Sequence, residues 1–243
     1  MCRMLGVVSR RAERLPELVP SFAEFIALSQ EHKDGWGMAW WENGGLALVK
    51  EPEAAFGSER FDRAVGETRL NFGILHFRLA SVGERTYENT HPFAAGERAF
   101  CHNGSIDVGA FLGERLPNEA ARGSTDSERY FYALARLLDE GRSAEEATRD
   151  VTEAVVGAGF RFSSLNFLLL TRDALYAYCR YHPDAENVRR DPEYYRLRLY
   201  TSKDLVVVAS SGWREGDRWP SLGNGDLLRV DRQSLETSVV SLL

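Results

Sequence analysis

The spacing of apolar positions changes along this chain, and the changes predict an order of strands and helices. Near the start, the run VVSR at residues 7–10 is typical of a strand, and residues 21–30 follow it with apolar positions at i, i+3 and i+4. This is the spacing of one buried helix face. Ser21 and Glu24 form the S-x-x-E pattern of a capping box, so we expect a helix to begin near Ser21.

Strand-like runs then form two blocks with two helical stretches between them. In the first block, MAWW and LALVK flank Asn43-Gly44-Gly45, residues that suit the positive φ angles of a hairpin turn. Two further strand candidates complete this block, at residues 71–81 and 97–106. Capping residues and glycines bound two predicted helices, and the second block of strands follows them. The helices span residues 124–141 and 143–159, and the later strands lie within residues 164–181, 204–211 and 225–242.

This order predicts the class of fold. Helices between blocks of strands, with strands that are apolar on both faces, favour an α+β protein in which two sheets stack between helical layers. The chain has no internal repeat and no linker rich in Gly, Ser or Pro. We therefore expect one domain over residues 1–243.

Charge and composition exclude several functional classes. The 30 basic and 36 acidic side chains give a formal net charge of −6, which disfavours nucleic acid and anionic membrane surfaces as partners. No apolar run approaches the roughly 18 residues of a membrane span. A short apolar patch precedes the arginines at the start of the chain, the reverse of a secretory signal, so we expect a cytoplasmic protein. The three cysteines lie far apart, a spacing that suggests neither a disulfide framework nor a zinc site.

Cys2 is the first candidate for chemistry. Removal of Met1 would leave a cysteine with both a thiol and a free α-amine, whose pKa near 7.7–8.0 suits it to accept the thiol proton. The alternative is that Cys2 is a small buried apolar residue at the start of a strand.

Six short motifs occur along the chain in a defined order. They are MCRMLG at the start, HKDGWGMAWW at 32–41, LHFRLAS at 75–81, NTHPF at 89–93, FCHNGSI at 100–106 and STDSE at 124–128. In order and spacing the chain resembles the class II glutamine amidotransferases, which are N-terminal-nucleophile (Ntn) hydrolases with a four-layer αββα sandwich. It looks closest to the stand-alone branch that includes the γ-glutamyl hydrolase of ergothioneine biosynthesis and the amidotransferase-like subunit of glutathione degradation.

The resemblance implies a role for each matched residue. Cys2 would be the nucleophile, and Asn103 with Gly104 would form the oxyanion hole. Arg78 would pair with the substrate α-carboxylate, and Asp126 would accept from the α-ammonium. Each has an ordinary alternative: Arg78 as a strand-end arginine, Asp126 as a helix N-cap, and Asn-Gly as a hairpin turn.

Further residues of these motifs have supporting roles by resemblance. His91 would shape the pocket wall and Ser81 would support the pocket. His76, His91 and His102 match no metal-site spacing, so we expect structural histidines, no metal and no cofactor. The segment DGWG is expected to bring backbone close to the first strand, with a core tryptophan as the alternative.

The chain also departs from its relatives. Residues 206–216 lack the Glu-Pro that often follows the late apolar strand in this branch, and Leu79 stands where the aminosugar- and nucleotide-forming amidotransferases have an aromatic gate residue. We also expect no fused synthetase domain, since the chain ends at Leu243. The leading hypothesis is hydrolysis of glutamine or of a γ-glutamyl amine or peptide, with a larger leaving group near Trp213. The alternatives are a glutaminase subunit that delivers ammonia to a separate synthetase, a catalytically idle γ-glutamyl-binding subunit, and a structural sandwich with coincidental motifs. The oligomeric state stays open.

Overall fold

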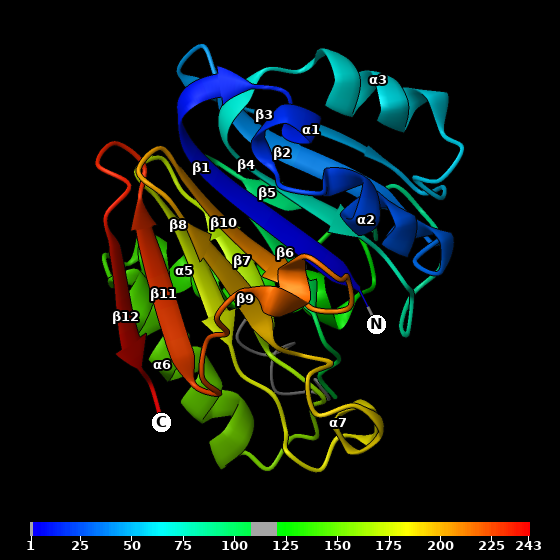
Figure 1. Ribbon diagram of the computed structural model, residues 1–243. Coiled ribbons are helices and arrows are strands. Elements are labelled where there is room, and N and C mark those ends of the chain that lie inside the picture. The colour runs from blue at the N-terminus through cyan, green and yellow to red at the C-terminus, as the bar shows by residue number, and fades with distance from the viewer. Residues whose placement is uncertain (1, 108–120) are drawn as a thin grey trace.

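Two antiparallel sheets stack face to face, and helices cover both outer faces. We describe residues 2–107 and 121–243 of a computed structural model (Figure 1). Each sheet has six strands, and every strand pair is antiparallel. The predicted α+β class and the four-layer order of helices, sheet, sheet and helices are confirmed.

The first sheet, sheet A, carries the start of the chain on an interior strand. Its order is β3-β2-β4-β1-β10-β9. Its strands are β1 (Arg3–Glu13), β2 (Trp36–Glu42), β3 (Gly45–Glu51), β4 (Leu70–Phe77), β9 (Leu197–Thr201) and β10 (Leu205–Ser210).

The second sheet, sheet B, has the order β12-β11-β8-β7-β6-β5. Its strands are β5 (Phe93–Ala95), β6 (Arg98–Asn103), β7 (Asn166–Leu170), β8 (Ala174–Cys179), β11 (Asp226–Asp231) and β12 (Thr237–Ser241). The helices are α1 (Leu15–Leu18), α2 (Phe22–Ala27), α3 (Glu59–Glu67), α5 (Asp126–Asp139), α6 (Ala144–Gly157) and α7 (Glu186–Arg190), with short 3₁₀ turns η1 (Leu28–Gln30) and η2 (Gly216–Arg218).

Three apolar cores hold the layers together. Between the sheets, Met4 and Val8 of β1 pack with residues of β7 and β8, while their neighbours Leu5 and Val7 pack on the opposite face with α1, α2 and α3. A third core lies between sheet B and the helices α5 and α6. This alternation along β1 follows from the two-residue period of a strand, and it directs the even-numbered side chains of β1 toward sheet B.

The facing sheet lies close to β1 at the position where β1 carries a glycine. A Cβ atom on Gly6 would lie 2.8 Å from Cδ2 of Leu175 on the facing sheet. A larger residue there would push the sheets apart, so Gly6 sets the spacing beside the first residues of the chain.

The local predictions held unevenly. The β2–β3 hairpin turns at Asn43 and Gly44, both with positive φ, as predicted. Ser143 caps α6 with a reciprocal capping box. The capping box predicted for Ser21 is wrong, because Ser21 has a φ of 52° and its side chain makes no cap hydrogen bond. The helix itself, α2, begins one residue later, at Phe22.

Among the described residues, no helix combines the length and apolarity needed to cross a bilayer.

Candidate active site

Cys2 lies at the start of β1, between the two sheets. It is 7% exposed, and the β1–β4 register pairs Arg3 with Phe77, which brings Cys2 opposite Arg78. Because side chains alternate along a strand, the Cys2 side chain lies on the same face as that of Met4, toward sheet B. The Cys2 Sγ atom lies 3.8 Å from the carbonyl oxygen of Leu79, to which the thiol donates.

The surroundings of Cys2 favour the neutral thiol. Burial raises its pKa above the usual 9.0, and the nearby Asp126 carboxylate raises it further, against the smaller opposing effects of the Leu79 hydrogen bond and the Arg78 charge. A buried thiol of this kind needs a proton acceptor before it can attack a carbonyl. Met1 lies outside the described residues, so its removal to supply an α-amine stays a prediction.

Asn103 ends β6 and is completely buried. Neither Oδ1 nor Nδ2 of its amide has a hydrogen-bond partner within residues 2–107 and 121–243. Buried amides are almost always paired, so an amide without a partner among the described residues calls for an explanation. The amide therefore presents an unused N–H donor and an unused acceptor at the end of β6.

The backbone after Asn103 passes close to a neighbouring strand. A Cβ atom on Gly104 would lie 1.9 Å from the carbonyl oxygen of Ser164, so only glycine fits. The alternative of an Asn-Gly hairpin turn is wrong, because β6 pairs with β7, which begins at Asn166, and Gly104 has no positive φ.

Asp126 is the first residue of α5 and is 5% exposed. Its Oδ2 atom accepts a hydrogen bond from the backbone N–H of Ile106 at 2.7 Å. The N-cap is Thr125, whose hydroxyl accepts from the Glu128 N–H, so the interpretation of Asp126 as a plain N-cap is wrong. The carboxylate instead joins the start of α5 to the segment that follows Gly104.

Beside Asp126 the surface has a pocket of about 560 Å³. Val82, Ile106 and Phe162 give it apolar walls, and Asp126 and Arg161 supply opposite charges. The pocket reaches from the loop after β4 to the segment that leads into β7.

Arg78 lies directly after β4, 2% exposed, and its guanidinium donates to main-chain carbonyls. The partners are the oxygens of Glu84 at 3.0 Å, Val82 at 2.9 Å and Gly83 at 3.2 Å, with that of Asp34 further away at 3.5 Å. No carboxylate pairs with Arg78 among the described residues. The arginine thus holds the loop that follows it, and a carboxylate ligand would have to replace those carbonyls.

The DGWG segment contacts this loop through its backbone and through Asp34. Asp34 and Gly35 exchange backbone hydrogen bonds with Arg78, and the Asp34 carboxylate accepts from the Ala80 N–H at 2.8 Å and pairs with Arg85. Trp36 is a fully buried core residue. Ser81 is exposed in the loop, and the structure does not bring it into this network.

Three histidines are buried near the ends of β4 and β6. The rings of His76 and His91 lie 4.2 Å apart, and burial holds the pKa of both well below the usual value. His102 faces α5, where one ring nitrogen lies 2.8 Å from Ser127 Oγ and the other 3.0 Å from the Ser164 carbonyl. A carbonyl can only accept, so Nε2 carries the proton. No group of three potential metal ligands occurs in the described part of the chain.

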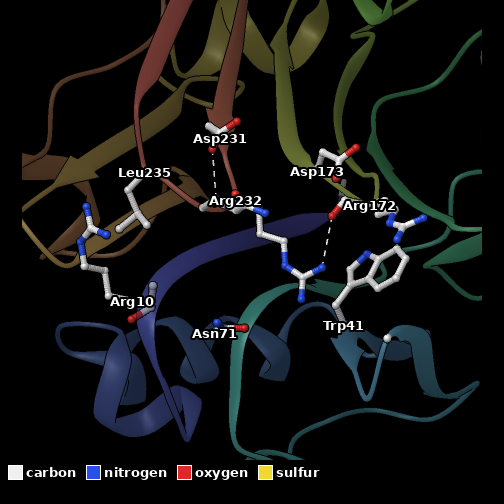
Figure 2. A pocket seen from close by; sticks show the side chains of 11 residues that line it. Arg10, Trp41, Asn71, Arg172, Asp173, Asp231, Arg232 and Leu235 are labelled. Carbon is white, nitrogen blue, oxygen red and sulfur yellow. Dashed lines mark hydrogen bonds between the residues drawn. The ribbon is translucent and has the colours of Figure 1, made fainter.

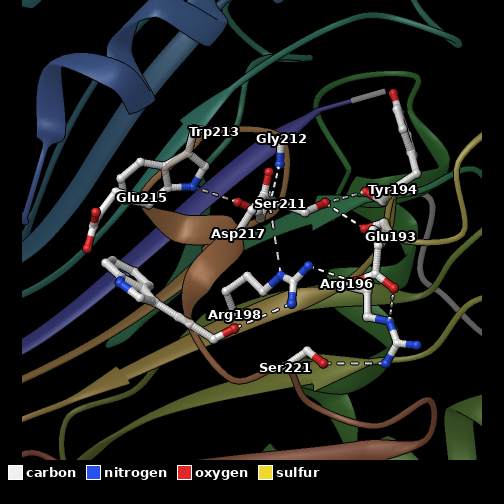
Figure 3. Close-up of polar contacts among 12 residues, drawn as sticks. Glu193, Tyr194, Arg196, Arg198, Ser211, Gly212, Trp213, Glu215, Asp217 and Ser221 are labelled. Carbon is white, nitrogen blue, oxygen red and sulfur yellow. Dashed lines mark hydrogen bonds and ion pairs between the residues drawn. The ribbon is translucent and has the colours of Figure 1, made fainter.

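The segment after β10 lies beside the start of β1, on the side away from β4 (Figure 3). Ser210 Oγ accepts from the Met4 N–H at 3.0 Å, and Ser211 Oγ donates to the Glu193 carbonyl at 2.7 Å. Trp213 is only 3% exposed, and it packs with Phe25 on the helix side of sheet A. The expectation of a leaving-group site near Trp213 is therefore wrong.

Two residues near Cys2 escaped the sequence analysis. Arg3 donates to the Cys2 carbonyl at 3.3 Å, and its guanidinium lies 4.6 Å from the centre of the Tyr194 ring. Its place next to Cys2 was a usable signal. Tyr194 had none, because only the fold brings it from the far end of the chain.

Comparisons with known proteins identify relatives of this chain. The profile described as "Glutamine amidotransferases class-II" matches residues 1–232. An uncharacterized protein of Methanocaldococcus jannaschii is 28% identical over 94% of this chain and 68% of its own length. The chain spans 56 to 68% of the first three curated relatives.

Solved structures share the fold. A glutamine aminotransferase class-II domain protein from Silicibacter pomeroyi superposes with a TM-score of 0.68 over the whole of both chains, at 18% identity. The glutamine phosphoribosylpyrophosphate amidotransferase of B. subtilis also gives 0.68, at 16% identity, over 49% of that chain.

Proposed function

Because this chain belongs to the class II glutamine amidotransferases, we propose that it is a cysteine amidohydrolase that cleaves the γ-amide of glutamine or of a γ-glutamyl amine or peptide. The observation that carries the proposal is the fully buried amide of Asn103, which has no partner among the described residues and is followed by a glycine that admits no side chain. Such a pair offers donors to an oxygen that becomes negative during reaction.

The reaction would proceed in two balanced stages. With Met1 removed, the α-amine of Cys2 takes the thiol proton, and Sγ attacks the γ-carbonyl carbon. The Asn103 Nδ2 and the Gly104 N–H donate to the resulting oxyanion. The C–N bond then breaks, the amine leaves with the proton from the α-ammonium, and water hydrolyses the γ-glutamyl thioester to glutamate. No cofactor enters these steps.

Head-group recognition would use the two charges beside Cys2. Arg78 would bind the α-carboxylate through its planar fork of donors, and Asp126 would accept from the α-ammonium. In the structure Arg78 donates to loop carbonyls instead, so substrate binding would exchange those hydrogen bonds for the carboxylate. His91, neutral and in contact with His76, would form part of the wall, and Ser81 would act only if its loop moved inward.

The second candidate is a glutaminase subunit that supplies ammonia to a separate synthetase. The relatives favour it, since the glutamine–fructose-6-phosphate aminotransferase of Brucella abortus is 30% identical over 161 residues, and that match spans only 26% of the enzyme. An idle γ-glutamyl-binding subunit would keep the head-group residues without turnover. We place all three in the cytoplasm, in line with the composition of the chain.

One assay separates these candidates. Purified protein is incubated with glutamine and with a panel of γ-glutamyl amines and peptides, alone and after addition of proteins from cell extract, and glutamate release is measured. We expect the isolated protein to turn over a γ-glutamyl conjugate. Activity restricted to glutamine and dependent on an added partner would assign the donor function, and binding of γ-glutamyl ligands without any turnover would assign the idle subunit.

A further inference from the structure

A second pocket lies at the end of the sandwich opposite Cys2. It has a volume of about 760 Å³, within the range of small-molecule sites, and it is lined from both sheets (Figure 2). Arg10 lines it from β1, eight residues after Cys2 along the strand. At about 3.3 Å per residue the pocket is roughly 25 Å from the thiol, so it is no part of the proposed active site.

Three arginines from separate turns and strands line this pocket. They are Arg10 of β1, Arg172 in the turn between β7 and β8, and Arg232 directly after β11. Asn71 and Gln233 add neutral amide groups to the lining. The chain as a whole is acidic, so this gathering of guanidinium groups is opposite in sign to its net charge.

Arg232 is held in place while most of its donors stay available. Its guanidinium lies 5.2 Å from the centre of the Trp41 ring and 5.1 Å from that of Phe72, and Figure 2 shows the side chain extending from the end of β11 toward Trp41. Nη1 donates to the main-chain carbonyl of Arg172 at 3.2 Å. A guanidinium carries five N–H donors, so a ligand can still bind in the fork.

The other charged residues of the lining differ in whether they are already paired. The Arg172 side chain makes no hydrogen bond or ion pair with the described residues. Asp231 is occupied, since it accepts from the Gln233 N–H at 3.0 Å and pairs with Arg229 at 2.8 Å. Arg10 shares its charge with the exposed Asp204 at 3.7 Å. Of the acidic side chains that line the pocket, Asp173 is thus left to face the arginines.

We propose that this pocket binds a small anionic metabolite that carries a phosphate or carboxylate group. Two of the arginines offer planar donor forks, which match the paired oxygens of both groups. An anion between Arg172 and Arg232 would also relieve the repulsion between their charges. That repulsion adds to burial in lowering the pKa of Arg232, against the opposing effect of Asp173.

Titration calorimetry at low ionic strength tests the site, with pyrophosphate and citrate as separate probes on the full chain. Binding of pyrophosphate alone would assign a phosphate ligand, and binding of citrate alone a carboxylate ligand. The variant Arg172→Gln should weaken binding by about tenfold or more, because one charge-assisted contact is lost without disturbing a structural hydrogen bond.

The matched control is Arg189→Gln, an equally simple charge removal on α7, where the arginine is 69% exposed. It should leave the affinity unchanged. The proposal is overturned if neither probe binds at about 10 mM, an affinity too weak for a built site. It is also overturned if the two variants lower the affinity equally, which would show a general charge effect.

Discussion

Removal of the Asn103 side chain should abolish most of the activity and cost little stability. The amide is fully buried and has no partner in the part of the chain that the structure describes, so the folded protein carries its desolvation cost, about 1–3 kcal/mol, without a compensating hydrogen bond there. Asn103→Ala removes that cost, which stabilises the folded state, and loses a few packing contacts, which destabilises it. We expect the free energy of unfolding to change by no more than about 1 kcal/mol.

The catalytic effect should be much larger. An oxyanion-hole donor typically contributes a factor of about 10²–10³ to kcat, or roughly 3–4 kcal/mol. Asn103→Ala should therefore lower kcat for glutamate release by about that factor, and KM should change little because the donor acts on the transition state.

The chain offers a matched control across the β6–β7 pair. Asn166 lies opposite Asn103, is equally buried, and has a fully bonded amide: Nδ2 donates to the Tyr195 carbonyl, and Oδ1 accepts from the Arg180 N–H at 2.7 Å. Asn166→Ala should lower the free energy of unfolding by about 2–4 kcal/mol, because two polar groups lose their partner.

Urea denaturation and steady-state kinetics on both variants decide the matter. If Asn103→Ala loses as much stability as Asn166→Ala while kcat stays within about threefold of the wild type, Asn103 is a structural residue and the oxyanion hole lies elsewhere.

Of three other predictions, two address the site and one addresses Lys50, a buried residue of β3 whose Nζ donates to the Thr90 carbonyl at 2.7 Å. Intact-mass measurement should show active protein without Met1, and a diazo-ketone glutamine analogue should label Cys2 and spare the two internal cysteines; full activity with Met1 retained would refute the α-amine as base. Arg78→Lys should raise KM for the γ-glutamyl substrate about tenfold or more, since an ammonium lacks the planar fork; a loss of stability with unchanged KM would leave Arg78 only its loop contacts. Burial lowers the pKa of Lys50 to about 8 from 10.5. The charged side chain therefore destabilises the folded state fully below pH 8, and this destabilisation falls as the pH rises from 8 to 10.5 and is absent above 10.5. Urea denaturation across this range should show the wild type gaining stability relative to Lys50→Met, by at most ~3 kcal/mol, and a flat difference would contradict the shift.

Local sequence signals predicted most elements and failed where distant residues decide. The S-x-x-E pattern formed a capping box at Ser143 but not at Ser21. In the second case Glu24 is engaged by Arg214 and by the Glu215 N–H, from the far end of the chain. Strand β9 was missed because Arg198 interrupts its apolar pattern. That arginine pairs with the nearby Glu193 and also with Asp217, which lies 19 residues further along the chain.

The site shows the same division. Motif order indicated Cys2, Asn103 and Asp126, and the structure brings all three to one end of the sandwich. The hydrogen-bond partners of the site residues could not be predicted from the sequence. The loop carbonyls that bind Arg78, and the lack of a partner for the Asn103 amide among the described residues, both depend on packing. The buried position of Trp213 likewise follows from Phe25 and Trp219, which are remote from each other in the chain.

The place of β1 inside sheet A also fixes an order of events during synthesis. One neighbour of β1 is β4, but the other is β10, which begins at Leu205, about two hundred residues after Cys2. At roughly 5–20 residues per second, a ribosome needs on the order of 10–40 s to make that intervening chain. Until β10 emerges, the side of β1 that faces Ser210 stays open and the sandwich cannot close. The removal of Met1 that the proposed mechanism requires therefore has tens of seconds in which to occur before the fold buries Cys2.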